Sequence, residues 1–304
     1  SILNNIEQSA VKALIYRKDG KILLQKRDYK PNLKWPGCWN LFGGLVEEKE
    51  KLPDALKREL HEELKIEFNQ IDKKIFEWKS SDCITNFCFP IYFNIPYDNL
   101  QLMEGEKMEW FEPYELVNLK LTSFLENNIS NILLFLKKIK PKTIIDYENQ
   151  VIKKLKLIKK NERVFYTKNK TPVFNKHYIY LLQSLAGIYN IPLIRLCLHK
   201  NNDDLIHEML MIHNKKHKVG PLRQNNSNSL SYHVLKGKGI ICLYDKLGNK
   251  KKEILMDDND FEGYTHCRLS ANVYRTIESK TEPFVFIETS SGPFKDEDTK
   301  WFKQ

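Results

Sequence analysis

The sequence lacks the features of a membrane protein, a disulfide-rich secreted domain or a zinc ribbon. It has no run of about 18 apolar residues, which excludes an ordinary transmembrane helix. Residues 1–21 do not show the positively charged segment followed by an apolar segment that is typical of a secretory signal peptide. The six cysteines are scattered, and none forms a C-x-x-C pair. We therefore expect reduced thiols, no structural zinc site, a cytoplasmic location and no membrane partner.

The chain has enough apolar residues for two domains and carries its excess charge in one place. Its 304 residues are 41% hydrophobic and 12% aromatic, which excludes a disordered chain.

The formal net charge is +10, and residues 137–170 contain 12 Lys or Arg against three Asp or Glu. We interpret this basic stretch as a solvated linker and helix face rather than a nucleic-acid interface.

The first half of the chain predicts a mixed α and β domain. Two apolar runs on either side of Asp19-Gly20 predict a β-hairpin over residues 11–25. Helices are predicted over 53–64 and 123–138, with strands over 74–78 and 84–95. We assign residues 1–140 to this domain.

The second half predicts a different architecture. A basic linker or helix over residues 141–163 leads into a domain over 164–304, which begins with a helix over 178–189. Short alternating segments broken by turns follow, and such a series is typical of a β-sandwich or barrel. These segments are 207–213, 231–235, 239–244, 254–256, 274–277 and 283–288.

The most informative segment is the predicted helix that carries Glu59, Glu62 and Glu63. The spacing places these three carboxylates on neighbouring parts of one helix side, beside a stripe of leucines that can pack on a sheet. Like charges at this spacing repel, so a compensating cation is expected, and hard oxygen ligands suit Mg²⁺ or Mn²⁺. The competing interpretation is a solvated acidic face.

The spacing around this helix resembles the Nudix box. Gly44, Glu50 and residues 58–66 (RELHEELKI) follow G-x5-E-x7-R-E-U-x-E-E-x-G-U, where U is a bulky aliphatic residue. One position departs, because Lys65 stands where the motif has glycine. The similarity to MutT-like members extends over about residues 11–136 and implies an α/β/α sandwich around a mixed sheet.

The resemblance implies a divalent-metal site. Glu59, Glu62 and Glu63 would bind Mg²⁺ or Mn²⁺, and the carbonyl oxygen of Gly43 would add a ligand. Glu59 is also a candidate for the base that deprotonates water.

The resemblance also implies positioning and substrate-binding residues. Arg58 would hold Glu50 or Glu62 in its working rotamer, a task that suits a guanidinium fork. Glu104 would supply another ligand or the base. We place Arg27 and Glu50 in the substrate-binding part, although Arg27 is equally compatible with an ordinary surface arginine.

The implied reaction is hydrolysis of a nucleoside diphosphate linked to another moiety. Metal ions neutralise the phosphate oxygens and lower the pKa of bound water, and a carboxylate removes its proton. The products would be a nucleoside monophosphate and the phosphorylated moiety, and a nucleotide sugar is the preferred substrate.

Residues 164–302 resemble the WbuC-type cupins of bacterial surface-polysaccharide pathways. The matching segments are 195–199 (RLCLH), 207–210 (HEML), 232–237 (YHVLKG) and 286–294 (FIETSSGPF). This similarity implies an all-β double-stranded β-helix barrel with a pocket in its mouth. The overall fold class is therefore α+β, and a homodimer through the cupin domain is expected by analogy.

The cupin-like half differs from the resembled family at the positions that usually carry the metal ligands. The positions of the usual His and Glu ligands correspond to Leu222, Gln224, a site near Leu230, and Arg275. Leucine cannot ligate a metal and arginine adds positive charge, so we expect a cupin without a cofactor. The candidate pocket residues are Arg195, Arg223, His233 and Arg275, and the arginines suit an anionic or sugar-phosphate ligand.

Three alternatives remain open at this point. A nucleoside triphosphate pyrophosphohydrolase would cleave triphosphates but not nucleotide sugars. An RNA-binding module, with the Nudix half as a binding domain, would bind RNA with steeply salt-dependent affinity. A nucleotide-sugar isomerase or epimerase in the cupin half, using His233 or Tyr232 as acid/base, would convert its substrate without releasing phosphate.

Overall fold

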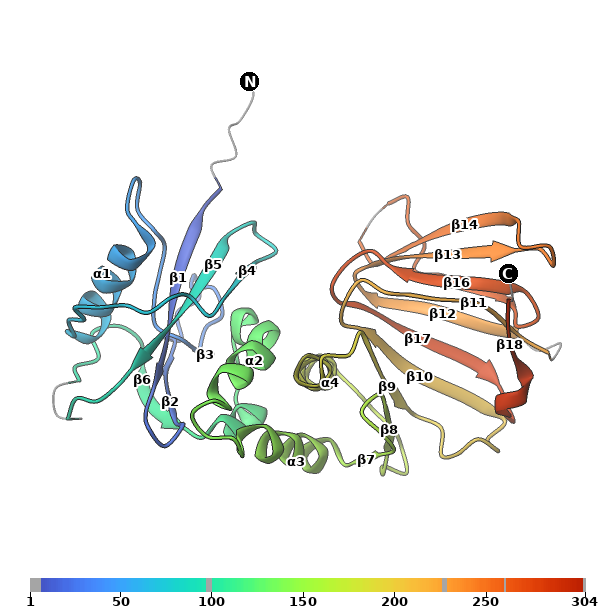
Figure 1. Cartoon of the computed structure of the whole chain (residues 1–304), viewed down its shortest axis with the longest axis horizontal. Coiled ribbons are helices and arrows are strands. Elements are labelled where there is room, and N and C mark those ends of the chain that lie inside the picture. The colour runs from blue at the N-terminus through green and yellow to red at the C-terminus, as the bar shows by residue number, and fades with distance from the viewer. Residues whose placement is uncertain (1–6, 97–99, 226–228, 260, 303–304) are drawn as a thin grey trace, which may run out of the picture. The chain divides into compact units, whose positions relative to one another are not determined.

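The chain folds into two compact units, residues 1–151 and 152–304, which are described separately (Figure 1). The computed structural model describes residues 7–96, 100–225, 229–259 and 261–302. The ends of the predicted domains, residues 1 and 304, lie outside this range. All six cysteines are free thiols. Among the described residues, every helix is too short or too polar to cross a bilayer.

The first unit is built on a six-stranded mixed sheet in the order β3-β2-β1-β5-β4, with β6 paired to β2. The central strands β1 and β5 run parallel, and the other pairs are antiparallel. The strands are β1 (Ser9–Tyr16), β2 (Ile22–Lys26), β3 (Trp39–Asn40), β4 (Phe76–Lys79), β5 (Thr85–Tyr92) and β6 (Lys107–Phe111). The predicted hairpin is confirmed, whereas the segment before the acidic helix forms only the two-residue strand β3.

Helices cover both faces of this sheet, as the sequence predicts for a sandwich (Figure 1). The helices are α1 (Leu52–Leu64), the 3-10 helix η2 (Pro113–Asn118) and α2 (Ser123–Leu136). Residues of β1 alternate between the two faces because strand side chains point to opposite sides. Val11, Ala13 and Ile15 pack with α1, while the ring centroid of Tyr16 lies 5.3 Å from that of Phe135 on α2.

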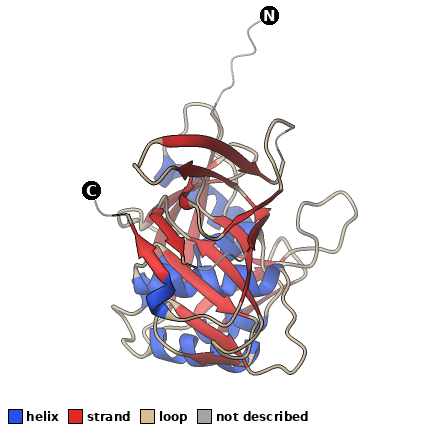
Figure 2. Cartoon of the chain, turned by 90° about the vertical axis from the view of Figure 1, so that its right-hand side faces the viewer, coloured by secondary structure: helices blue, strands red, loops and turns tan. Residues whose placement is uncertain are grey.

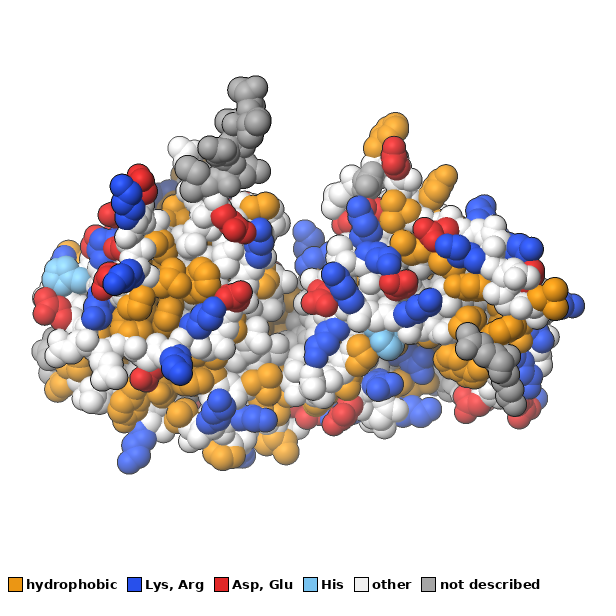
Figure 3. Space-filling model, turned by 45° about the horizontal axis from the view of Figure 1, so that its top comes forward, with side chains coloured by type: hydrophobic (Ala, Val, Ile, Leu, Met, Phe, Trp, Pro, Cys, Tyr) orange, Lys and Arg blue, Asp and Glu red, His pale blue; other side chains and the backbone are white. Residues whose placement is uncertain are grey.

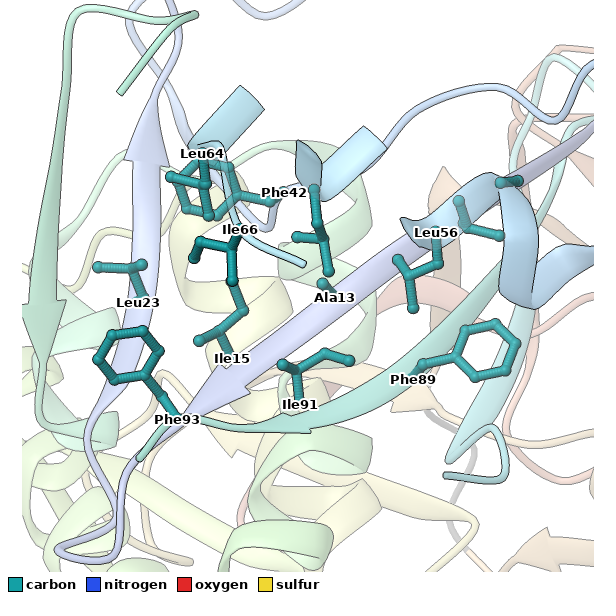
Figure 4. Close-up of a cluster of buried hydrophobic side chains, with 13 residues drawn as sticks. Ala13, Ile15, Leu23, Phe42, Leu56, Leu64, Ile66, Phe89, Ile91 and Phe93 are labelled. Carbon is teal, nitrogen blue, oxygen red and sulfur yellow. The ribbon is translucent and has the colours of Figure 1, made fainter. Parts of the chain in front are cut away.

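The leucine stripe of α1 docks the acidic helix on the sheet (Figure 4). Leu56, Leu60 and Leu64 are 0% exposed and belong to a core cluster with Phe42, Phe89 and other residues of the sheet. Burying each of these side chains stabilises the fold by about 1.5–3 kcal/mol. The same packing sets the rotation of α1, and therefore which of its glutamates face the sheet.

The predicted basic linker contains regular structure. The helix α3 (Thr143–Leu155) and the strand β7 (Leu157–Lys159) occupy most of residues 141–163. Tyr147, Val151 and Leu155 recur at helical spacing and are buried, which explains the helix. On the face drawn in Figure 3, basic side chains are scattered among acidic ones.

The described residues of the second unit form two sheets, with the helix α4 (Lys176–Tyr189) and a short 3-10 helix beside them (Figure 2). One sheet has the order β15-β12-β17-β10-β9-β8-β7 and the other β14-β13-β16-β11-β18. Residues of both sheets form one core, including Tyr232 and Phe286 from the first and Ile241 and Ile277 from the second. The two sheets therefore pack face to face in an all-β arrangement, which is consistent with a cupin.

The remaining bounds are as follows. The first sheet contains β8 (Val164–Thr167), β9 (Leu193–Cys197), β10 (Ile206–His213), β12 (Ser229–Lys236), β15 (His266–Ser270) and β17 (Phe284–Ser291). The second contains β11 (Lys218–Gln224), β13 (Lys238–Tyr244), β14 (Lys250–Asp257), β16 (Tyr274–Ser279) and β18 (Thr299–Trp301), preceded by the 3-10 helix η3 (Asp296–Asp298).

The C-terminus of α1 explains the motif position at which the sequence departs. Lys65 follows the helix with φ 57° and ψ 32°, and its backbone N–H donates to the carbonyl of His61. This left-handed conformation is strained for a side chain with a Cβ and is the conformation for which glycine is favoured. The chain therefore retains the helix end of the motif without the usual residue.

We predict that Lys65→Gly stabilises the protein by up to about 1 kcal/mol, because relief of left-handed strain exceeds the added entropy of the unfolded chain. The matched control is Lys57→Gly in the middle of α1, which should destabilise by about 1 kcal/mol. Urea unfolding of both variants measures whether the free energy of unfolding rises in the first and falls in the second. Destabilisation by both substitutions would contradict the strain argument.

Candidate active site

The three glutamates of α1 occupy different environments on one side of the helix. Glu63 is buried at 5% exposure, the side chain of Glu59 is 15% exposed and that of Glu62 is 53% exposed. The leucine stripe causes this gradient, because it turns Glu63 toward the sheet and leaves Glu62 toward solvent. The predicted carboxylate cluster therefore contains two desolvated groups and one exposed group.

Glu63 is held by two donors from the sheet side. Its Oε1 accepts from Nε2 of Gln25 at 3.0 Å, and its Oε2 accepts from the backbone N–H of Gly43 at 2.8 Å. Burial nevertheless raises the pKa of Glu63 to about 7, against the opposing effects of these bonds and of Lys12. Gln25 was missed in the sequence analysis, and the only available signal was a polar residue ending an otherwise apolar strand.

Arg58 joins the carboxylates of the site. Its Nε and Nη2 donate to the two oxygens of Glu50 at 2.9 and 3.0 Å, which is a bidentate pair. Its Nη1 donates to Glu59 at 2.8 Å and contacts Glu62 at 3.4 Å. The main partner of Arg58 is thus Glu50 rather than Glu62, and its positioning role stays a prediction.

The contacts of Arg58 and the degree of burial shift the pKa values of these carboxylates in opposite directions. The hydrogen bonds from Arg58 lower the pKa of Glu50, and the Glu50 bond raises the pKa of Arg58. Burial raises the pKa of Glu59 even though Arg58 opposes it. Glu50 is therefore a fixed anion that orients the guanidinium, whereas for Glu59 and Glu63 the effect of burial exceeds that of their positive neighbours, Arg58 and Lys12.

The glycine pair before α1 provides the space that these carboxylates occupy. A Cβ at Gly43 would lie 2.1 Å from the carbonyl oxygen of Val11, and Gly43 has φ 126°. A Cβ at Gly44 would lie 2.5–2.6 Å from the carboxylate atoms of Glu59. The first glycine permits the turn against β1, and the second leaves room for a functional side chain.

The loop before β6 runs beside the end of α1. The backbone N–H of Met103 donates to the carbonyl of Glu63 at 2.9 Å. Glu104 follows directly and is exposed, while Glu106 pairs with Lys26 at 3.0 Å. A Cβ at Gly105 would lie 2.9 Å from the carbonyl oxygen of Lys26. The structure thus places the loop that carries Glu104 beside the C-terminal end of α1, and the chemical role of Glu104 stays a prediction.

Arg27 follows β2 directly and closes the loop that precedes β3. Its Nε donates to the carbonyl of Lys34 at 2.9 Å, and its backbone N–H donates to that of Cys38 at 2.9 Å. One edge of the guanidinium is therefore used by the loop itself. The predicted contact with a phosphate stays a prediction.

The donor set fits a divalent cation that is completed by substrate. Within the described part of the chain, no group of three or more His, Cys, Asp or Glu side chains forms a ready metal cage. Mg²⁺, however, is usually bound by one or two carboxylates together with waters and substrate phosphates. Two desolvated carboxylates with raised pKa values, Glu59 and Glu63, provide such a partial site.

The candidate residues of the second unit divide between the inside and the outside of the β structure. Arg195 and Arg275 line a cavity, together with Leu222 and Gln224 from the positions that correspond to metal ligands in the resembled family. Leu230 is buried but does not line it.

The placement of Arg223 and His233 in this pocket is corrected by the structure. Arg223 lies on β11 between two lining residues, donates to Asn225 at 2.8 Å and stacks on Tyr274 at 5.2 Å. His233 is exposed next to the buried Tyr232, with its ring 5.7 Å from that of His266. Strand alternation points both side chains outward, because their neighbours point into the core.

Comparisons with known proteins agree with the N-terminal site. Residues 7–131 match the family model described as NUDIX domain. A search of curated protein sequences found no match. The acidic helix, its arginine and its glycine turn all fall within the matched residues. This match supports the predicted class of enzyme, a Nudix pyrophosphohydrolase.

Similar solved structures include three that each cover less than half of the chain. The MutT protein from Methanosarcina mazei Go1 is 21% identical, covers 44% of this chain and 95% of its own, and has a TM-score of 0.37. The E. coli ORF135 protein is 27% identical, with 44% and 92% covered and a TM-score of 0.36. A cupin superfamily protein from Desulfitobacterium hafniense DCB-2 is 16% identical, with 33% and 76% covered and a TM-score of 0.26. All three TM-scores lie below 0.5, so they do not by themselves establish the fold.

We predict that Gly44→Ala lowers hydrolase activity about 10- to 100-fold with little change in stability. The new methyl group displaces the Glu59 carboxylate, and the loss of a ligand's position typically costs this much. The steady-state rate at saturating Mg²⁺ and the melting temperature measure the two effects. The adjacent Leu45→Ala is the control, because it removes an exposed side chain, and equal losses in both variants would argue against the mechanism.

We predict that a divalent cation stabilises the protein more strongly as pH rises from about 5 to about 8. Glu63 keeps its proton in the metal-free fold up to a pKa of about 7, well above the ordinary value of 4.5, so the metal-free fold loses stability as pH rises through this range. A cation replaces that proton. Melting temperatures with Mg²⁺ and with a chelator, across this pH range, measure the difference.

Glu63→Gln is the matched variant for this pH effect. The amide keeps an oxygen that can accept from Gly43 and carries no charge, so both the pH dependence and most of the cation effect should disappear. A cation effect in the native chain that is constant across the range would contradict the prediction.

Proposed function

We propose that the NUDIX domain of this chain, a pyrophosphohydrolase domain, hydrolyses the diphosphate of a nucleotide sugar in a Mg²⁺-dependent reaction. The products are a nucleoside monophosphate and a sugar phosphate. The observation that carries the proposal is the guanidinium of Arg58 shared among three carboxylates, with Gly44 leaving room for one of them.

The chain's own residues account for the positions of the reacting groups. Glu59 and Glu63 would hold the cation, with Glu62 and the carbonyl of Gly43 beside them. A bound divalent ion supplies neutralisation of phosphate oxygens and a lowered pKa of bound water. Arg58 is anchored by Glu50, so the orientation of Glu59 does not depend on substrate.

A carboxylate has to accept the proton that water loses. Glu59 and the exposed Glu104 are the two candidates for this base. The Glu104 side chain lies on a loop that is tied to the end of α1 through Met103, so it can approach substrate without disturbing the helix. Arg27, which directly follows β2, would contact a phosphate.

The choice of a nucleotide sugar rests on the second unit. We infer that this all-β unit is a cupin of the polysaccharide-pathway type, because its strands form two facing sheets around a cavity and its sequence carries the segments that resemble that family. A domain of that type joined to a pyrophosphohydrolase domain favours a sugar-linked diphosphate over a free nucleotide. This step is an association, and a substrate screen tests it directly.

The test incubates purified full-length protein and Mg²⁺ with nucleoside triphosphates and nucleotide sugars, and follows products by phosphate-sensitive chromatography. We expect cleavage of a nucleotide sugar to a monophosphate and a sugar phosphate. The double variant Glu62→Gln with Glu63→Gln should lose activity on the order of 10²-fold or more, because it removes cation-binding charge.

The control variant is Glu67→Gln, which changes an exposed glutamate, 84% accessible, just beyond α1 and outside the motif. It should retain full activity. Cleavage of triphosphates alone would replace the nucleotide sugar by a free nucleotide as substrate. Cleavage of neither class by folded protein would overturn the proposal.

A further inference from the structure

The second unit contains a cavity with apolar and charged lining residues that the hydrolase site does not use. Its volume is about 330 Å³, near the lower end of ligand pockets, which span roughly 300–1,000 Å³. The cavity is lined by strands of both sheets, and its apolar wall includes Met209, Met211 and Phe286. It can therefore hold one small molecule against an apolar wall.

Arg275 brings a buried positive charge to this cavity, and its hydrogen bonds among the described residues go to uncharged acceptors, although the carboxylates of Glu288 and Asp296 line the same cavity. It is 2% exposed and donates to the hydroxyl of Tyr232 at 2.8 Å, to Oε1 of Gln224 at 2.8 Å and to the carbonyl of Ala271 at 3.3 Å. Among the described residues, all of these acceptors are uncharged. A guanidinium has five N–H donors, so donors remain for a ligand.

A second arginine has a donor without a partner. Arg195 lines the same cavity from β9, and its Nε is buried with no hydrogen-bond partner among the described residues. A buried donor that is left unsatisfied costs about 1–3 kcal/mol, and more when it is charged. Such a group is expected where a ligand completes its hydrogen bonds.

The cavity also contains groups that suit hydroxyls rather than charge. Tyr232 links Arg275 to the carboxylate of Glu288, and burial raises the pKa of Tyr232, so its hydroxyl stays protonated. His213 is 1% exposed, and its Nδ1 has no hydrogen-bond partner among the described residues. Burial, with a smaller effect of His217, lowers the pKa of His213 to about 4, so it is a neutral hydrogen-bonding group at pH 7.

We propose that this cavity binds a monosaccharide-sized anion through Arg195 and Arg275, with sugar hydroxyls on Glu288 and His213. The anionic group is a phosphate or a carboxylate, since both match a guanidinium fork. The apolar wall packs against a face of the sugar ring. This binding site is independent of catalysis by the first domain, and it needs no metal ion.

The test measures binding of glucose 1-phosphate and glucuronate to the full-length chain by calorimetry. The Glu63→Gln background and a chelator suppress the hydrolase site. Glucose is the neutral match, and inorganic phosphate tests whether the sugar ring contributes. We expect binding of at least one sugar anion, with glucose bound at least about tenfold more weakly, since a hydrogen bond to a charged group is worth this factor or more. The two sugar anions distinguish phosphate from carboxylate.

Three arginine variants locate the binding. Arg195→Gln and Arg275→Gln should each weaken it about 10- to 100-fold. Arg223→Gln is the matched control on the outer face and should leave it unchanged. If Arg275→Gln fails to fold, Arg195→Gln decides alone, because its side chain makes no hydrogen bond through Nε that the fold depends on.

Two results would overturn the proposal. The first is an absence of binding of both sugar anions to folded protein at millimolar concentration. The second is binding that glucose reproduces with equal affinity, or that survives Arg195→Gln unchanged. Either would show that the two guanidinium groups serve the fold and not a ligand.

Discussion

Burial of the Glu63 carboxylate against the sheet is the interaction on which the rest of the N-terminal site depends. A desolvated carboxylate is costly unless hydrogen bonds or a cation compensate it. Gln25 and the backbone of Gly43 satisfy its two oxygens, and the positive charge of Lys12 also favours the carboxylate, yet burial keeps the pKa of Glu63 raised. The fold therefore retains a carboxylate whose desolvation is only partly compensated, and this property couples the packing of α1 to the chemistry of the site.

The site arginines of the two units differ in the partners that their guanidinium groups contact. In the first, Arg58 is balanced by Glu50 and orients Glu59, so its charge is used inside the protein. In the second, Arg275 donates only to uncharged acceptors among the described residues, and the buried Nε of Arg195 has no hydrogen-bond partner there. On our proposals, the same side chain positions other groups where it bonds carboxylates directly, and binds a ligand where its bonds go to neutral groups.

The sequence predicted a helix and its orientation correctly where the periodic pattern of apolar residues allows only one buried face. The leucine stripe of α1 has one face to bury, so helix, orientation and carboxylate side were all predictable. Residues 141–163 were predicted as a basic linker or helix without a choice between the two, because their lysines obscured the buried spacing of Tyr147, Val151 and Leu155. At Lys65 the residue type was misleading instead, since the backbone keeps a left-handed helix end that lysine does not favour.

The sequence by itself determined the carboxylate helix, its arginine and its glycine turn, because residues a few positions apart on one helix need no tertiary information to be placed together. Only the tertiary structure decided that Gln25 holds Glu63, that Arg195 and Arg275 share a cavity, and that Arg223 and His233 point away from it. These contacts join distant segments through strand pairing, and a shift of one residue in a strand reverses the direction of every side chain. Local spacing does not contain that information, and the packing of the two sheets does.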